Sequence, residues 1–304
     1  MIVNFIGLAY LRYIAKLWTE IMNDMIQPNK MYGYETFTMK SAISGQKYRI
    51  FLSVPEKPAP PSGYPVIYTL DANIRFATVA ESVAAFERCN ISSTLVIGIG
   101  YPDEFDRVKQ RQIDMTPAES SNHPADIGGA DDFLKYIQQE LKPEIARRFK
   151  VDENSQSLFG HSFGGLFALY TLLTAPDSFH NYIAASPSLW WQEKMLSHAT
   201  IRDGLAPKLK KLQHEPRVLI TVGSKEEGDD PDFPRIRPPK QAALFAKRTM
   251  VDVAENFADF LKALKGVYCE YYMFEGEDHG TVVPVAISRM TRFIFRHPDR
   301  DISP

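Results

Sequence analysis

A serine enclosed by two glycines is the residue of this chain best suited to covalent chemistry. Ser162 lies in Gly160–Gly164, which reads Gly-His-Ser-Phe-Gly, after an apolar run typical of a strand and before one typical of a helix. In such a turn the serine hydroxyl is exposed on a sharp strand-to-helix bend, and only glycines let the backbone pass so closely. The pattern predicts a nucleophile elbow for acyl transfer. His161, the variable residue of the motif, is expected to point away from the site.

A serine of ordinary pKa is a poor nucleophile, so this chemistry needs a base and a group that orients the base. Of the seven histidines, His279 is the one that follows the last predicted strand and precedes the closing helix. Catalytic side chains of open α/β sheets gather at the carboxyl ends of strands. We therefore predict that His279 is the base. A histidine that only caps the helix start is the structural alternative.

An acidic cluster follows the strand that precedes the one leading to His279. The chain order serine, acid, histidine points to this strand end, which reads Gly-Ser-Lys-Glu-Glu over residues 223–227. Glu226 is the predicted acid. Glu227, Asp229 and Asp230 remain alternatives, because a loop could bring any of these carboxylates under the imidazole.

Two backbone amides are expected to form an oxyanion hole. In such folds one donor is the N–H of the residue after the nucleophile, here Phe163. The second comes from the loop after the third strand, here Leu70–Asn73, and we predict the amide of Asn73. A tight turn that merely closes the strand would use the same residue types.

Strands and helices alternate along the chain, which predicts an α/β fold with a mostly parallel central sheet and helices on both faces. We expect an antiparallel hairpin over 35–54, followed by buried strands at 66–70, 95–99, the run before the elbow, 182–185, 218–222 and 267–274. The expected helices cover 79–88, 131–149 with a kink at Pro143, 163–174, 205–212, 245–264 and 281–296, and a long loop covers 101–129. One domain, 31–304, should follow a helical N-terminal extension, 1–30.

Composition excludes several classes of protein. With 44% hydrophobic and 24% charged residues the chain is globular, and a net charge of -2 gives no general affinity for nucleic acid or anionic membranes. Cys89 and Cys269 lack metal-ligand spacing and suggest neither a disulfide framework nor a metal site. We read them as reduced core thiols of a cytoplasmic protein. The apolar stretch Met1–Leu11 is about half the ~20 residues of a membrane span.

Five segments together resemble a known family. The chain is similar to esterases of the α/β-hydrolase superfamily, and among them to siderophore trilactone esterases of the ferri-bacillibactin and enterobactin types. The segments that carry the resemblance are Gly63–Asp71, Gly98–Pro102, Leu158–Leu169, Ser186–Trp191 and Thr221–Glu226.

The resemblance covers the chain from about Tyr34 to the last helix and implies an α/β-hydrolase fold. It also implies a triad of Ser162, His279 and Glu226, and an oxyanion amide from the turn 71–73. Such proteins often carry glycine where this turn has Ala72.

The implied substrate is a small cyclic triester with catecholate arms. Ferric iron would arrive with that substrate, and no cofactor of the protein itself is expected. Trp190 and Trp191 follow a strand end near the elbow and could stack on catechol rings, and Arg111 could meet their negative charge. A hydrophobic lid or core role for the tryptophans, and a structural ion pair of Arg111 with Asp114, are the alternatives.

Two other functions fit the same residues. One is a general carboxylesterase or thioesterase for small acyl or aromatic esters, because this fold and triad serve many substrates. The other is a catalytically silent binding protein on a hydrolase scaffold.

Overall fold

A computed structural model of the chain describes residues 34–89, 91, 93–118, 127–192, 199–227 and 250–296. The described residues from Glu35 onward form one compact unit. The helix expected in the N-terminal extension lies outside the described residues.

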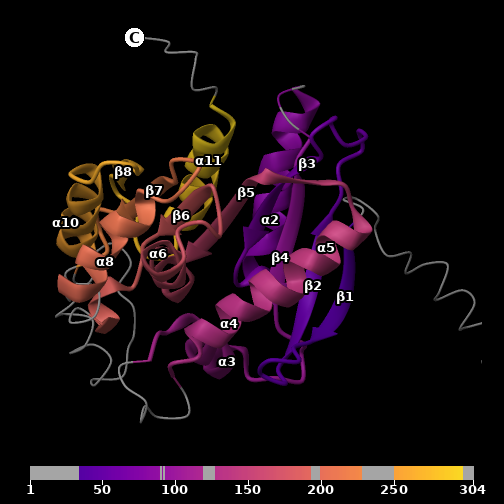
Figure 1. Cartoon of the computed structure of the whole chain (residues 1–304), viewed down its shortest axis with the longest axis horizontal. Coiled ribbons are helices and arrows are strands. Elements are labelled where there is room, and N and C mark those ends of the chain that lie inside the picture. The colour runs from indigo at the N-terminus through magenta and orange to yellow at the C-terminus, as the bar shows by residue number, and fades with distance from the viewer. Residues whose placement is uncertain are drawn as a thin grey trace, which may run out of the picture. The chain divides into compact units, whose positions relative to one another are not determined.

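Within the described residues, eight strands form one sheet in the order β1-β2-β4-β3-β5-β6-β7-β8 (Figure 1). Strand β2 pairs antiparallel with both β1 and β4, and every other pair is parallel. The predicted mostly parallel sheet with an opening hairpin is confirmed. The strands are β1 (Glu35–Lys40), β2 (Lys47–Ser53), β3 (Tyr64–Thr69), β4 (Leu95–Gly100), β5 (Val151–His161), β6 (Asn181–Ala185), β7 (Arg217–Gly223) and β8 (Tyr268–Phe274).

The order of strands changes direction between β3 and β5. From β3 the chain crosses to β4 on one side, and it then returns to β5 on the other side. A crevice opens at such a switch point beyond the carboxyl ends of the two strands, and ligands of open α/β sheets bind there. Strand β5 ends directly before Ser162, so the elbow stands at this switch point.

Helices cover both faces of the sheet, as predicted. On one face α2 and α11 pack against each other and against the strands, whereas α4, α6, α8 and α10 contribute to a core cluster on the other face (Figure 1). The helices are α2 (Ala72–Arg88), α3 (Arg107–Met115), α4 (Ala130–Tyr136), the π-helical turn Ile137–Leu141, α5 (Lys142–Arg148), α6 (Phe163–Thr174), the 3-10 turn Leu189–Gln192, α8 (Ala199–Leu209), α10 (Met250–Lys262) and α11 (Val282–Phe295).

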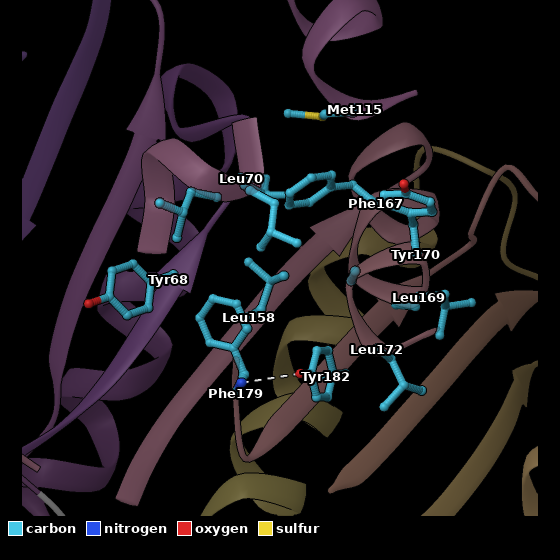
Figure 2. Packing of buried hydrophobic residues seen from close by; sticks show 14 of the residues in the cluster. Tyr68, Leu70, Met115, Leu158, Phe167, Leu169, Tyr170, Leu172, Phe179 and Tyr182 are labelled. Carbon is cyan, nitrogen blue, oxygen red and sulfur yellow. Dashed lines mark hydrogen bonds between the residues drawn. The ribbon is translucent and has the colours of Figure 1, made fainter. Parts of the chain in front are cut away.

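The core beneath the elbow joins three elements that carry site residues. Leu70 at the end of β3, Phe167 of α6 and Met115 of α3 belong to one buried cluster, and Figure 2 shows them around Leu158 of β5. Close packing of this kind leaves little freedom for any one element to shift alone. The cluster therefore fixes the elbow helix relative to the loop after β3.

Three helix predictions differ from the structure. Helix α2 begins at Ala72 rather than Val79, because the chain passes from β3 into the helix through the single left-handed residue Asp71. Helix α3 lies inside the expected loop 101–129, where Asp106 caps it by accepting hydrogen bonds from the amides of Val108 and Lys109. Helix α8 begins at Ala199 and ends at Leu209, whereas the sequence predicts a helix over 205–212.

Pro143 lies in the first turn of α5, directly after the π-helical turn. A proline removes one backbone donor and crowds the preceding turn, and a π-helical turn is one way to accommodate it. Both cysteines are free thiols, but Cys89 is exposed and Cys269 only half-buried. The prediction that they are core thiols is therefore wrong for Cys89, which ends α2 at its solvent side.

Candidate active site

Ser162 stands between the last residue of β5 and the first residue of α6, with φ 61° and ψ -117°. A Cβ on Gly160 would lie 2.1 Å from the carbonyl oxygen of Gly164, so only glycine fits there. Positive φ is rare for a serine and costs free energy that the surrounding packing must offset. The predicted sharp strand-to-helix turn is present, and it presents the Ser162 side chain at the switch point.

The hydroxyl of Ser162 contacts a second serine. Its Oγ lies 3.1 Å from Oγ of Ser188, a buried residue in the segment after β6. The Ser188 amide also donates to the Ser162 carbonyl at 3.1 Å. Among the described residues the Ser162 hydroxyl therefore rests on Ser188 and not on a histidine. Catalytic hydrogen bonds are often long or misaligned without substrate and tighten when it binds.

The imidazole of His279 is held by a buried carboxylate. Its Nδ1 lies 2.7 Å from Oε2 of Glu226, whose side chain is 0% exposed. The other oxygen, Oε1, accepts hydrogen bonds from the Gly223 amide at 2.7 Å and from the Ser186 hydroxyl at 2.5 Å. Three donors thus hold the carboxylate in one orientation, and the Nε2 side of the imidazole remains for proton transfer.

Glu227 is directed elsewhere. Its Oε1 accepts hydrogen bonds from the amides of Val251 and Asp252 at the start of α10, at 2.9 and 3.3 Å. A carboxylate at a helix N-terminus is favoured by the helix dipole and by the unpaired amides there. Asp229 and Asp230, the remaining alternatives for the acid, lie outside the described residues.

Backbone strain concentrates at the same edge of the sheet. Among the described residues, the non-glycine residues with positive φ are Asp71 (53°), Ser162 (61°) and Ser186 (44°). They follow β3, β5 and β6, which are adjacent in the sheet. Residues with such strained backbone angles persist only where the surrounding packing and hydrogen bonds hold them in place, and they are often found at functional sites. The three strand ends thus define one site.

The predicted oxyanion donors open two helices that meet at this edge. Phe163 is the first residue of α6, and Asn73 is the second residue of α2. The N-terminus of a helix carries a partial positive charge from the helix dipole, which favours the binding of an anion there. A Cβ on Gly164 would lie 3.6 Å from Oδ2 of Asp71, so the two helix starts adjoin.

The Asn73 side chain fixes the loop after β3. Its Oδ1 accepts a hydrogen bond from the Tyr101 amide and its Nδ2 donates to the Tyr101 carbonyl, both at 2.8 Å. Ala72 therefore does not disturb the turn, because the neighbouring Asp71 takes the left-handed conformation.

Arg111 reaches the site from α3, but its charge is already paired. Its guanidinium donates to both carboxylate oxygens of Asp71, at 2.7 and 2.8 Å, and its Cζ lies 5.2 Å from the ring centroid of Phe163. The alternative pairing with Asp114 is wrong, because Asp114 accepts a hydrogen bond from the Tyr101 hydroxyl at 3.0 Å. Arg111 therefore bridges the residues that begin α2 and α6.

The two tryptophans lie in the 3-10 turn Leu189–Gln192 after β6, next to the Ser188 that contacts the Ser162 hydroxyl. Trp190 is half-buried, whereas the side chain of Trp191 is outside what the structure describes. Sequence reasoning missed the roles of Ser186 and Ser188. Their position directly after a predicted strand, flanking Pro187, was the available signal.

Metal ligands and membrane spans were sought in the same part of the chain. Among the described residues, no group of three or more His, Cys, Asp or Glu side chains is placed to hold a metal ion. None of the described helices has the length and apolarity required to cross a membrane.

Known proteins resemble this chain over most of its length. Residues 41–280 match the model of a family described as "Putative esterase". The chain is 36% identical over 282 residues to the ferri-bacillibactin esterase BesA of Bacillus subtilis, covering 88% of this chain and 91% of that protein. It is 31% identical to a siderophore triacetylfusarinine C esterase of Aspergillus fumigatus, covering 90% of this chain and 97% of that protein.

A solved structure shows the same fold. The crystal structure of the BES protein from Bacillus cereus superposes with a TM-score of 0.71 at 35% identity, covering 86% of this chain and 95% of that one.

Proposed function

This chain belongs to the family described as "Putative esterase" and is an esterase of the α/β-hydrolase type, and from that premise we propose that it hydrolyses siderophore esters through Ser162, His279 and Glu226. The resemblance expected from the sequence is confirmed at the level of the family. The hydrogen bond from His279 to the buried Glu226, together with the strained conformation of Ser162, is the observation that carries the catalytic proposal.

In the proposed reaction, Ser162 Oγ attacks the ester carbonyl while Nε2 of His279 takes its proton. The tetrahedral intermediate collapses, and the imidazolium returns the proton to the leaving alkoxide, which departs as an alcohol. Water then attacks the acyl-enzyme, again with His279 as base, and releases the acid and free Ser162. Glu226 holds the imidazole in one tautomer and stabilises its charged form.

The oxyanion of each tetrahedral intermediate would bind the amides of Phe163 and Asn73. Support comes from the position of both residues at adjoining helix starts, where the positive end of each helix dipole favours a negative charge. Arg111 contacts both helix starts, through its ion pair with Asp71 and its cation-π contact with the Phe163 ring, and so holds them together. Preorganised donors need no reorganisation during the reaction, which is the source of their effect on rate.

The proposed substrate is a catecholate siderophore trilactone of the ferri-bacillibactin type. Its support is the 36% identity over 88% of the chain to a protein named for that activity. Trp190 lies in the 3-10 turn after β6, and its indole would stack on a catechol ring. Ferric iron would enter as part of the substrate. Because another relative is named for triacetylfusarinine C, that siderophore is the natural competitor in an assay.

The test compares turnover of four esters: a ferric catecholate trilactone, its iron-free form, triacetylfusarinine C and 4-nitrophenyl acetate. We expect kcat/KM for a catecholate trilactone to exceed that for the aryl ester by at least about a hundredfold, because the remote contacts of the larger substrate lower its barrier. Equal or lower trilactone turnover would leave a general carboxylesterase and reject the siderophore assignment.

The catalytic residues are tested separately with a fluorophosphonate probe. We expect covalent labelling of the wild type, no labelling of Ser162→Ala, and labelling of His279→Ala slowed by several orders of magnitude. Unlabelled wild-type protein would instead support a silent binding protein on a hydrolase scaffold.

A further inference from the structure

The variable residue of the elbow motif, His161, turns toward the site instead of away from it. Its Nε2 lies 2.9 Å from the backbone carbonyl oxygen of His279, and the centroids of the two imidazole rings are 4.6 Å apart. The residue is only 6% exposed. The expectation that His161 points elsewhere is therefore wrong, and the last residue of β5 contacts the loop that carries the proposed base.

The contacts of His161 decide where its ring hydrogen lies. A carbonyl oxygen can only accept, so Nε2 must carry the hydrogen. The other nitrogen, Nδ1, faces Nη2 of Arg75 at 3.5 Å, and a guanidinium can only donate. Burial lowers the pKa of His161 well below its ordinary value, and the nearby His279 and Arg75 lower it further. The ring is thus a neutral Nε2–H tautomer, not a second base.

The backbone on either side of His279 is already fixed. The Glu277 carbonyl accepts a hydrogen bond from the Lys225 amide at 3.0 Å, on the side of β7. On the other side the Asp278 carboxylate accepts from the amides of Gly280 and Thr281, at 2.6 and 2.9 Å, at the start of α11. The peptide carbonyl of His279 itself is the remaining anchor point, and His161 donates to it.

His279 is consequently held at two points, its side chain and its backbone. Glu226 holds its Nδ1 atom, while His161 holds the carbonyl of the same residue. His161 is also covalently joined to Ser162. The strand end that presents the nucleophile therefore binds the backbone of the base directly, over a chain separation of 118 residues.

We propose that His161 is a positioning residue, whose Nε2–H hydrogen bond to the His279 carbonyl sets the distance between the His279 imidazole and the Ser162 hydroxyl. The inference rests on the proposed roles of Ser162 and His279. The hydroxyl of Ser162 rests on Ser188 before reaction, so it must rotate onto an imidazole that is already in place. A displacement of about 1 Å in such a pair can cost on the order of a hundredfold in rate.

Three variants separate positioning from packing. His161→Gln keeps a side-chain amide that can donate at about the Nε2 position, and His161→Leu keeps the volume without a donor. His161→Asn also carries an amide, but its side chain is too short for that amide to reach the His279 carbonyl.

For each variant we would measure kcat and KM with 4-nitrophenyl acetate, the rate of labelling by a fluorophosphonate, and the melting temperature. We expect His161→Leu and His161→Asn to lower kcat and the labelling rate by about 10- to 100-fold with KM changed less than about twofold. His161→Gln should recover most of that loss.

Rescue by glutamine but not by leucine, at a similar drop in melting temperature, supports positioning, because the two side chains have similar volumes and a packing role would not distinguish them. The inference is overturned if the variants without a donor in reach match the wild type, or if His161→Gln is as slow as they are. Should His161→Leu fail to fold, the comparison of Gln with Asn decides. The His279→Ala variant is the control for the proposed function. If it is labelled as fast as the wild type, His279 is not the base. If instead His279→Ala is slow and the His161 variants match the wild type, only the positioning role of His161 is rejected.

Discussion

Nδ1 of His279 lies 2.7 Å from Oε2 of Glu226, while the adjacent Glu227 accepts hydrogen bonds from amides at the start of α10. Two neighbouring carboxylates of the same chemistry thus face different partners. This divergence supplies a matched pair of substitutions, because each removes one negative charge from nearly the same place in the chain.

Glu226→Gln should lower kcat by about a hundredfold to ten-thousandfold, because an amide cannot accept from His279, Ser186 and Gly223 together and leaves the imidazole misoriented. Glu227→Gln should leave kcat within about twofold and lower stability by about 0.5–1 kcal/mol through a weaker helix cap. Steady-state kinetics and thermal melting check both. If Glu226→Gln keeps the wild-type kcat and Glu227→Gln loses it, the acid of the triad is Glu227 and not Glu226.

Arg111→Lys tests whether Arg111 orients the oxyanion amides or contacts substrate. Lysine cannot form the two parallel hydrogen bonds to Asp71 or stack on Phe163 as a planar guanidinium does. We expect kcat to fall by about tenfold with little change in KM, since oxyanion stabilisation acts only in the transition state. A rise in KM for the trilactone but not for 4-nitrophenyl acetate would instead favour direct contact with the substrate.

Two glycine-to-alanine variants test the close packing at the elbow. Gly160 has no room for a methyl group, whereas Gly204 lies in open space and serves as the control. At Gly160 the new Cβ would lie 2.1 Å from a backbone oxygen of the elbow, whereas at Gly204, in α8, no atom lies within 4 Å. We expect Gly160→Ala to destabilise the fold by more than about 2 kcal/mol. Gly204→Ala should stabilise it by about 0.5–1 kcal/mol through helix propensity.

Denaturant unfolding of both glycine variants checks these values. Equal stabilities of the two would contradict the close backbone approach at the elbow.

Asp114→Asn should change how stability depends on pH. Burial raises the pKa of Asp114 to about 7, although hydrogen bonds from Tyr101 and Gln110 oppose the shift. A carboxyl whose folded pKa lies above its unfolded value of about 3.9 stabilises the fold at low pH, and that contribution is lost as pH rises toward 7. The neutral amide has no such dependence.

The melting temperature of Asp114→Asn should therefore improve relative to the wild type as pH rises from 5 to 8. Thermal melting across this range gives the comparison. A difference that stays constant with pH would show that Asp114 titrates normally.

The sequence alone predicted the elements whose signals are local. The parallel strands read as continuous apolar runs because both of their faces are covered, and the structure contains each of them. Helix α3 was missed because its cap at Asp106 lies within a polar stretch without apolar periodicity. The start of α2 was missed because a single left-handed residue, Asp71, replaces the expected turn.

The candidate site divides in the same way. Ser162 and His279 were chosen from motif and chain order, since a glycine-flanked turn and a strand end are visible in a short stretch of residues. Chain order points to the strand end that carries both Glu226 and Glu227, the resemblance favours Glu226, and only the tertiary structure separates the partners of the two carboxylates.

What the sequence by itself determined is the fold class, the elbow and the strand ends at which the site residues stand. Only the tertiary structure decided that Arg111 pairs with Asp71, that Ser188 contacts Ser162, and that His161 donates to His279. These partners are separated by 40, 26 and 118 residues along the chain. Local patterns carry backbone preferences, whereas the direction of a side chain across a crevice depends on how separate strand ends pack together.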